Sequence, residues 1–180
     1  MLYNNGQRNQ NTNEGLASVT IVIRPATHDD AYPICAIYNA GIRSGLATFE
    51  TQERHVDTVL EWFSEIHKYP LLVAEAHHEV IGFAKLSEYR QRECYRGIAE
   101  FSIYLSDNAK GKGTGAKLLG ALIDCAKSHG FSKVLSRIFT FNHASLALCK
   151  KLGFREVGVY ERHGQLNGKW LDVVIVEKNL

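Results

Sequence analysis

The sequence predicts an α/β sandwich in which helices flank a mixed β-sheet. Runs of alternating or β-branched apolar residues, typical of strands, are interspersed with runs whose apolar residues recur every three or four positions, typical of helices. At 180 residues, 45% of them hydrophobic, the chain is long and apolar enough to bury the core of one domain. In chain order the runs read βααβββαβαββ, roughly seven strands and four helices.

The first part of the chain is expected to supply a tail, a strand and two helices. Residues 1–18 are rich in Asn, Gln and Gly, so we expect a disordered tail there and a single domain over 19–180. The β-branched run "VTIVIRPA" predicts a strand, and a helix follows with its cap at Thr27 or Asp29. A second amphipathic helix is expected over 55–67.

Three strands are expected next. "LLVAEA" and "VIGFAKLSEY" are separated by a tight turn at 77–79 and predict a hairpin. "IAEFSIYL" predicts another strand, whose alternation puts Glu100, Ser102 and Tyr104 on one face and the apolar residues on the other.

The last part is expected to alternate helices and strands. An amphipathic helix over 116–129 precedes the strand "KVLSRIF", and a helix capped by Asn142 stops at Gly153. The two remaining strands form a hairpin around Asn167 and Gly168.

Composition argues against several classes of protein. A net charge of +2 without massed basic residues lacks the signature of a nucleic-acid binder. The apolar runs are too short to span a membrane, and the first residues lack the apolar core of a signal peptide, so a cytoplasmic protein is expected. The four cysteines show no paired spacing, which predicts reduced thiols and no metal site.

The stretch "DNAKGKGTGAKLL" is the strongest local signal of function. A strand that runs into a glycine-rich turn opening a helix presents free N–H groups and the positive end of the helix dipole to an anion. Phosphate is the natural ligand, although the spacing fits neither the nucleotide triphosphate loop nor the dinucleotide fingerprint. A glycine turn that serves geometry alone is the alternative.

With this loop the chain resembles the GNAT family of N-acetyltransferases, because "KGKGTG" is similar to the family's pyrophosphate loop R/Q-x-x-G-x-G/A. The resemblance leaves only the tail uncovered and is closest to the branch that acetylates phosphinothricin, methionine sulfoximine and arsinothricin. It implies a mixed, mostly antiparallel central sheet flanked by about four helices. The segments that carry it are "ATFET", "YPLLVAE", "YRQRECYRG", "AEFSIYLSDNAKGKGTG", "NHASLALCKKLGF" and "GKWLDVV".

The resemblance implies acetyl-CoA as the acetyl donor and assigns its contacts. Backbone groups of Ile103, Tyr104 and Leu105 would bond the pantetheine arm, and Asn142 would contact the cofactor as well as, or instead of, capping its helix. Lys110 stands in the Arg/Gln position of the loop. The residues expected to cradle the pyrophosphate are Gly111, Lys112, Gly113, Thr114, Gly115 and Ala116.

Acetyl transfer to an amine needs a base and a proton for the departing thiolate. Glu100 resembles the branch's catalytic glutamate, and partial burial would raise its pKa toward a useful value. The alternative is a carboxylate that only pairs with Arg96 or Arg137. Cys149 stands where many relatives have tyrosine or histidine, and it is either the acid or an apolar packing residue.

The substrate side follows from the same resemblance. Arg90, Arg92 and Tyr95 match the branch's basic and aromatic positions, with Phe49 and Ser102 as further substrate contacts. A guanidinium suits a carboxylate, phosphinate or arsinate, whereas solvated loop arginines are the alternative.

The function expected is acetylation of the α-amino group of a small glutamate-like amino acid, which would detoxify such an inhibitor. The alternatives are an acetyltransferase for a protein N-terminus, polyamine or aminoglycoside, and a non-catalytic acyl-CoA sensor. A homodimer is expected from the resemblance.

Overall fold

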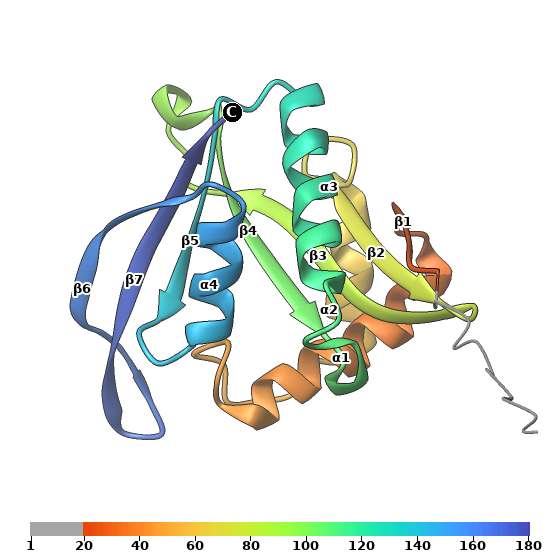
Figure 1. The fold of residues 1–180 in the computed structure, drawn as a ribbon, viewed down its shortest axis with the longest axis horizontal. Coiled ribbons are helices and arrows are strands. Elements are labelled where there is room, and N and C mark those ends of the chain that lie inside the picture. The colour runs from red at the N-terminus through yellow and green to blue at the C-terminus, as the bar shows by residue number, and fades with distance from the viewer. Residues whose placement is uncertain (1–19) are drawn as a thin grey trace, which may run out of the picture.

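The computed structural model describes residues 20–180, so the predicted tail, residues 1–18, lies outside the described residues. The described residues form strands and helices in the predicted order βααβββαβαββ (Figure 1). The strands are β1 (Val22–Pro25), β2 (Leu71–Ala76), β3 (Glu79–Glu88), β4 (Ile98–Leu105), β5 (Lys133–Phe139), β6 (Arg155–Leu166) and β7 (Lys169–Asn179). The helices are α1 (Ala31–Ser44), α2 (Val56–Leu60), α3 (Thr114–Ser128) and α4 (His143–Lys151).

The strands of residues 20–180 make one seven-stranded sheet with the order β1-β2-β3-β4-β5-β7-β6. Of its neighbouring pairs, only β4 and β5 run parallel. The predicted mixed, mostly antiparallel sheet is therefore confirmed.

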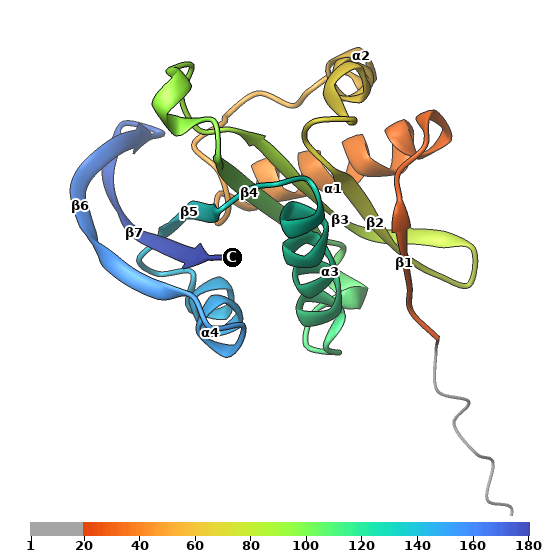
Figure 2. The same ribbon diagram turned by 90° about the horizontal axis from the view of Figure 1, so that it is seen from above.

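The helices cover both faces of the sheet, as Figure 2 shows: α1 and α2 lie on one face, and α3 and α4 on the other. The larger core cluster lies under α3, whose Leu118, Leu119 and Leu122 are almost fully buried. Burial of one such leucine stabilises the fold by roughly 2 kcal/mol. Among residues 20–180, no helix is long and apolar enough to cross a membrane.

β4 and β5 separate soon after they begin. Their pairing is confined to Ile98–Glu100 on β4 and 133–135 on β5. Beyond this point the two strands diverge toward the lower edge of Figure 1. Within the described residues, no strand pairs with that side of β4 after Glu100. The sheet therefore has a gap between β4 and β5. The edge of β4 that faces this gap is unpaired within the described residues.

Two predicted helix boundaries need correction. The helix expected over 55–67 is a short α-helix, α2, followed by a 3-10 helix, η2 (Glu61–Glu65). Buried Val59 and Phe63 still face the core, whereas Leu60, the last residue of α2, is exposed. The helix expected to begin at residue 116 begins at Thr114, directly after a left-handed Gly113.

Candidate active site

The glycine loop, residues 110–113, leads into α3 in the connection that follows β4. Gly111 and Gly113 have φ angles of 72° and 81°, which L side chains rarely adopt. A Cβ at either position would meet no atom within 4 Å, so the loop backbone faces open space. The two glycines are therefore required by backbone conformation, and the loop is open to a ligand.

The start of α3 leaves polar groups without protein partners. The first amide bonded within the helix is that of Lys117, which donates to the Gly113 carbonyl, so the preceding amides are free of the helical ladder. Thr114 is 1% exposed, and its hydroxyl has no hydrogen-bond partner among the described residues. Free amides, an orphaned hydroxyl and the positive end of a 15-residue helix together fit a diphosphate.

The lysines of the loop lie in solvent. Lys110 is exposed, and its Nζ lies 2.6 Å from Oδ1 of Asp107. This ion pair lowers the pKa of Asp107. Lys112 is also exposed. Both ammonium groups are accessible to a ligand at the loop, although that of Lys110 already forms an ion pair with Asp107.

The free edge of β4 includes Ile103, Tyr104 and Leu105, the residues expected to bond the pantetheine arm. Their side chains point elsewhere: Ile103 and Leu105 pack toward the α3 core, while Tyr104 packs against α1. Burial raises the pKa of Tyr104. The backbone groups of these residues are therefore the ones that face the gap.

Glu100 is the last residue of β4 that pairs with β5, so its side chain stands at the apex of the gap. Arg137 on β5 donates to both of its carboxylate oxygens: Nε and Nη2 lie 3.0 and 2.7 Å from Oε1, and Nη2 also donates to Oε2. The pairing with Arg137 is therefore confirmed, whereas Arg96 bonds Glu93 instead. The bidentate pair holds the carboxylate in one orientation.

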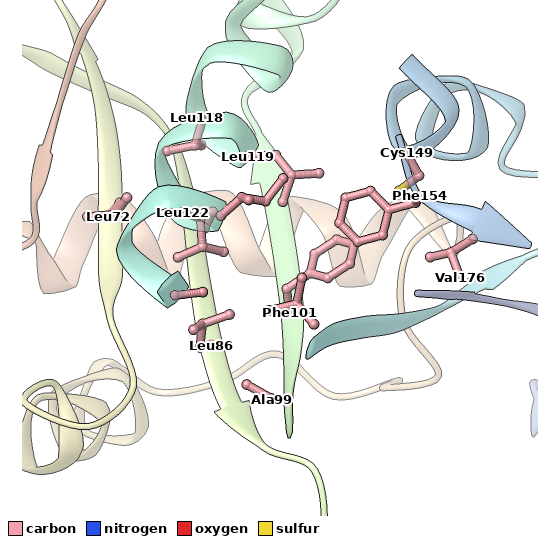
Figure 3. Packing of buried hydrophobic residues seen from close by; sticks show 14 of the residues in the cluster. Leu72, Leu86, Ala99, Phe101, Leu118, Leu119, Leu122, Cys149, Phe154 and Val176 are labelled. Carbon is pink, nitrogen blue, oxygen red and sulfur yellow. The ribbon is translucent and has the colours of Figure 1, made fainter. Parts of the chain in front are cut away.

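Cys149 lies in the hydrophobic core rather than on an open surface. The residue is 2% exposed, and Figure 3 shows its sulfur turned toward the ring of Phe154. Burial raises the pKa of the thiol to about 12. The surroundings favour the packing alternative, because a proton donor must reach the departing thiolate.

Asn142 caps α4, as the sequence predicted. Its side-chain oxygen accepts a hydrogen bond from the Ser145 amide at 3.1 Å. Its side-chain nitrogen donates to the carbonyl of Leu46 at 3.1 Å. The side chain thus ties α4 to the loop after α1, and its carboxamide has a protein partner at each end.

Phe49 lies on the same face of the sheet as Glu100. Its ring packs edge-on against the ring of Phe139 on β5, with the two ring centres 4.7 Å apart. Phe139 lies two residues after Arg137 on the same strand. A Cβ at Gly164 would lie 2.9 Å from the Phe49 ring, so glycine is needed where β6 bulges past it. Phe49 forms an aromatic wall at the diverging end of β5.

The loop with Arg90, Arg92 and Tyr95 lies at the opposite end of β4 from the glycine loop. The Arg90 guanidinium lies over the rings of Tyr89 and Tyr95, at 5.2 and 5.7 Å. Arg92 is exposed, and the loop lines a small hollow of about 90 Å³. The structure places this basic loop near the Glu100 end of β4, and Phe49 near the other end of β5.

Two side chains on the Glu100 face were not singled out by the sequence. Asn39 of α1 exchanges two hydrogen bonds with the Arg54 backbone, at 2.8 and 2.9 Å, which holds the loop of Phe49 in place. Lys85 of β3 is paired in register with Ser102. Alternation along β3 could have found Lys85, a charge amid the apolar run "IGFAKL", whereas no local signal connects Asn39 to Arg54.

The cysteine, histidine and acidic side chains of the described residues form neither a disulfide nor a metal site. All four cysteines are free thiols in the structure. Among residues 20–180, no three His, Cys, Asp or Glu side chains are grouped so that they could hold a metal ion.

Comparisons with known proteins agree with this geometry. Residues 23–175 match the family model described as the acetyltransferase (GNAT) domain. The chain is 36% identical to the L-methionine sulfoximine/L-methionine sulfone acetyltransferase of Pseudomonas paraeruginosa, over 88% of this chain and 94% of that protein. It is 30% identical to the phosphinothricin N-acetyltransferase of Streptomyces coelicolor, over 89% and 96% of the two chains.

A solved structure shows the same likeness in three dimensions. The phosphinothricin acetyltransferase of Sinorhizobium meliloti, determined in complex with acetyl-CoA, superposes with a TM-score of 0.84 at 35% identity and covers 89% of each chain. The free edge of β4, the glycine loop at α3 and these similarities lead to one assignment: the chain belongs to the GNAT family of acetyltransferases.

Proposed function

We propose that this protein is an acetyl-CoA-dependent N-acetyltransferase of a small glutamate-like amino acid, such as phosphinothricin, methionine sulfoximine or arsinothricin. The observation that carries the proposal is Glu100 at the apex of the gap between β4 and β5, at one end of a free strand edge whose other end leads to the glycine loop. Acetylation removes the ammonium charge of such an inhibitor, so the activity would serve detoxification or resistance.

Acetyl-CoA would supply the thioester whose acetyl group is transferred. The glycine loop and the first turn of α3 would hold its diphosphate through free amides, with Thr114 offering a hydroxyl. Backbone groups from Ile103 to Leu105 would bond the pantetheine arm along the free edge of β4. Asn142 would contact the cofactor through its second side-chain N–H or the second lone pair of its side-chain oxygen, while it keeps its present hydrogen bonds.

Glu100 would act as the general base. An amine attacks a thioester only as the neutral species, so the ammonium of the substrate must first lose a proton. The carboxylate, held by Arg137 at the apex, would take that proton, the new C–N bond would form, and the C–S bond would break. Transfer is direct in this account, and the buried Cys149 neither carries the acetyl group nor donates the thiolate's proton.

The basic loop would attract an acidic substrate to the site by its charge. Arg90 and Arg92 near the Glu100 end of β4 would attract an acidic amino acid and repel a polycation. Tyr95 stacks with Arg90 and limits its freedom, and Phe49 would bound the far side of the site. Polyamines and aminoglycosides are disfavoured for this reason.

Replacement of Glu100 by Gln tests the catalytic role. We expect kcat to fall by about 10²–10⁴-fold while acetyl-CoA binding is retained, because the amide keeps the shape but cannot accept the proton. The residual rate should rise as pH increases toward the pKa of the substrate amine, because the free amine then forms without a base. Steady-state kinetics from pH 6 to 10 with calorimetric cofactor titration measures both.

A matched control separates chemistry from folding. Glu93→Gln removes a carboxylate whose ion-pair partner among residues 20–180 is the exposed Arg96, and it should leave kcat within about twofold. Unchanged turnover in Glu100→Gln would contradict the proposed role of Glu100 as the base.

A cytoplasmic homodimer completes the proposal. β6 is a 12-residue edge strand whose residues are almost all exposed. Val157 and Val159 on β6, with Trp170 on β7, are large apolar side chains left in solvent. A long exposed edge strand that carries such apolar side chains is a template for pairing with a second strand, which supports assembly through β6.

A further inference from the structure

Lys85 is a charged residue on the face of the sheet that carries Glu100, and the mechanism above does not use it. Its backbone is paired with Ser102 on β4, and Ser87, two residues on, is paired with Glu100. In an antiparallel ladder, paired residues have Cβ atoms about 5 Å apart and diagonal neighbours about 7–8 Å apart. Lys85 therefore lies beside Ser102 and diagonal to Glu100.

The Lys85 ammonium has no anionic partner within the described part of the chain. It lies 4.0 Å from the centre of the Trp62 ring, and no hydrogen bond or ion pair to it occurs among residues 20–180. An ammonium carries three donors, of which a ring face occupies one side only. The Ser102 hydroxyl beside it makes no hydrogen bond to any described residue either.

Neighbouring charges do not neutralise Lys85. Arg54 shares the Trp62 ring, at 5.8 Å, but its guanidinium is held by Glu50 through bonds of 2.7 and 2.8 Å. Glu65 of η2 exerts only a weak attraction, and Glu100 is turned to Arg137 on the other side of β4. Burial, with the repulsion of Arg54, lowers the pKa of Lys85 to about 8. The fold thus maintains a partly buried cation at a cost in stability.

We propose that the Lys85 ammonium, together with the Ser102 hydroxyl, binds the anionic side-chain group of the amino-acid substrate. The Glu100 carboxylate reaches toward β5, whereas Lys85 lies on β3, on the opposite side of β4. Two strand spacings of about 4.8 Å separate these flanking strands. That separation suits a molecule whose amine and acidic group are several carbon atoms apart. The assignment rests on the proposed function, which it deepens by naming the subsite that selects an acidic substrate.

The test compares two substrates across three variants. Lys85→Met keeps the apolar stem against Trp62 and removes the charge, Ser102→Ala removes the hydroxyl, and Lys127→Met removes an exposed lysine on α3 as a control. For phosphinothricin, whose side chain is anionic, we expect KM to rise at least tenfold in Lys85→Met and severalfold in Ser102→Ala, with kcat within about twofold. For methionine sulfone, whose side chain is uncharged, KM should stay within about twofold. The Lys127→Met control should match the original protein with both.

Two outcomes would overturn the assignment: an unchanged KM for phosphinothricin, or an equal rise for both substrates, which would place Lys85 on the α-carboxylate instead. Calorimetric binding of glutarate, which has two carboxylates and no amine, separates this idea from the proposed function. Glutarate binding weakened tenfold in Lys85→Met would support the subsite even if no amino acid were acetylated. Glutarate that binds both proteins equally, or neither, would refute it.

Discussion

At Cys149 an apolar environment sets the chemistry of the thiol. The side chain is enclosed by the cluster that includes Phe101, Phe154 and Val176, and its pKa lies near 12. Desolvation is the only cause of that shift. A thiol in this position stabilises the fold by packing, as a small apolar residue does.

Replacement of Cys149 by Ala should therefore leave kcat within about twofold and lower the free energy of unfolding by about 1–2 kcal/mol, because a buried sulfur is lost. Steady-state kinetics and urea denaturation measure the two effects. A hundredfold loss of kcat with unchanged stability would restore the role of general acid.

Asp30 makes the stability of the fold sensitive to acid. Arg24 donates to both of its oxygens, at 2.7 and 2.9 Å, and this lowers the pKa of the nearly buried carboxyl. The folded protein thus binds the proton less readily than the unfolded chain, so this stabilisation is present above the unfolded pKa of about 4 and is lost as pH falls below it.

Replacement of Asp30 by Asn should cost about 2–3 kcal/mol at pH 7, because Arg24 then keeps one carboxylate partner among the described residues, Glu75. The loss should shrink as pH falls below about 4, because the Asp30 carboxyl of the unfolded original chain then takes up a proton more readily than that of the folded protein. Denaturation curves at pH 7 and at pH 3 measure it, and a pH-independent difference would contradict the ion-pair account.

At the scale of elements, the glycine loop shows where local sequence suffices. Gly113 ends the loop in a left-handed conformation and begins α3, and "KGKGTG" contains that information within a few residues. The strands and the caps of α4 were predictable for the same reason, because period and capping chemistry are local. The Glu100–Arg137 pair spans 37 residues and two strands, so the sequence could offer it only as one of two alternatives.

Replacement of Gly113 by Ala should cost about 1–2 kcal/mol, because L residues are strained at φ 81°. It should also raise KM for acetyl-CoA several-fold, since the loop amides would shift. Gly120→Ala is the control: it lies within α3 with open space around its Cβ, and the exchange should stabilise the helix by about 0.5–1 kcal/mol. An unchanged KM in Gly113→Ala would separate the loop from cofactor binding.

At the scale of the molecule, the two faces of the sheet have different roles. The face under α3 and α4 holds the larger core, and the other face carries Glu100, Ser102 and Lys85. Sequence alternation predicted this division for β4, but it could not show that β4 and β5 pair over only three residues. That opening arises from the packing of the whole sheet and has no local signal.

The proposed dimer is a property of the same scale. Light scattering coupled to gel filtration should give about twice the mass of the 20.2 kDa chain. Val159→Lys places a charge on the exposed edge strand and should shift the mass to that of the monomer without loss of secondary structure. A monomeric mass for the unaltered protein at all concentrations would contradict the proposed interface through β6.

The activity proposed for this protein is transfer of an acetyl group to a glutamate-like amino acid. Release of free thiol from acetyl-CoA measures this transfer, with phosphinothricin, methionine sulfoximine or arsinothricin compared with glutamate and a polyamine. We expect saturable turnover of at least one of the three inhibitors and none of the polyamine. Turnover of the polyamine alone, or tight acetyl-CoA binding with no thiol released by any of the amines, would contradict the proposal.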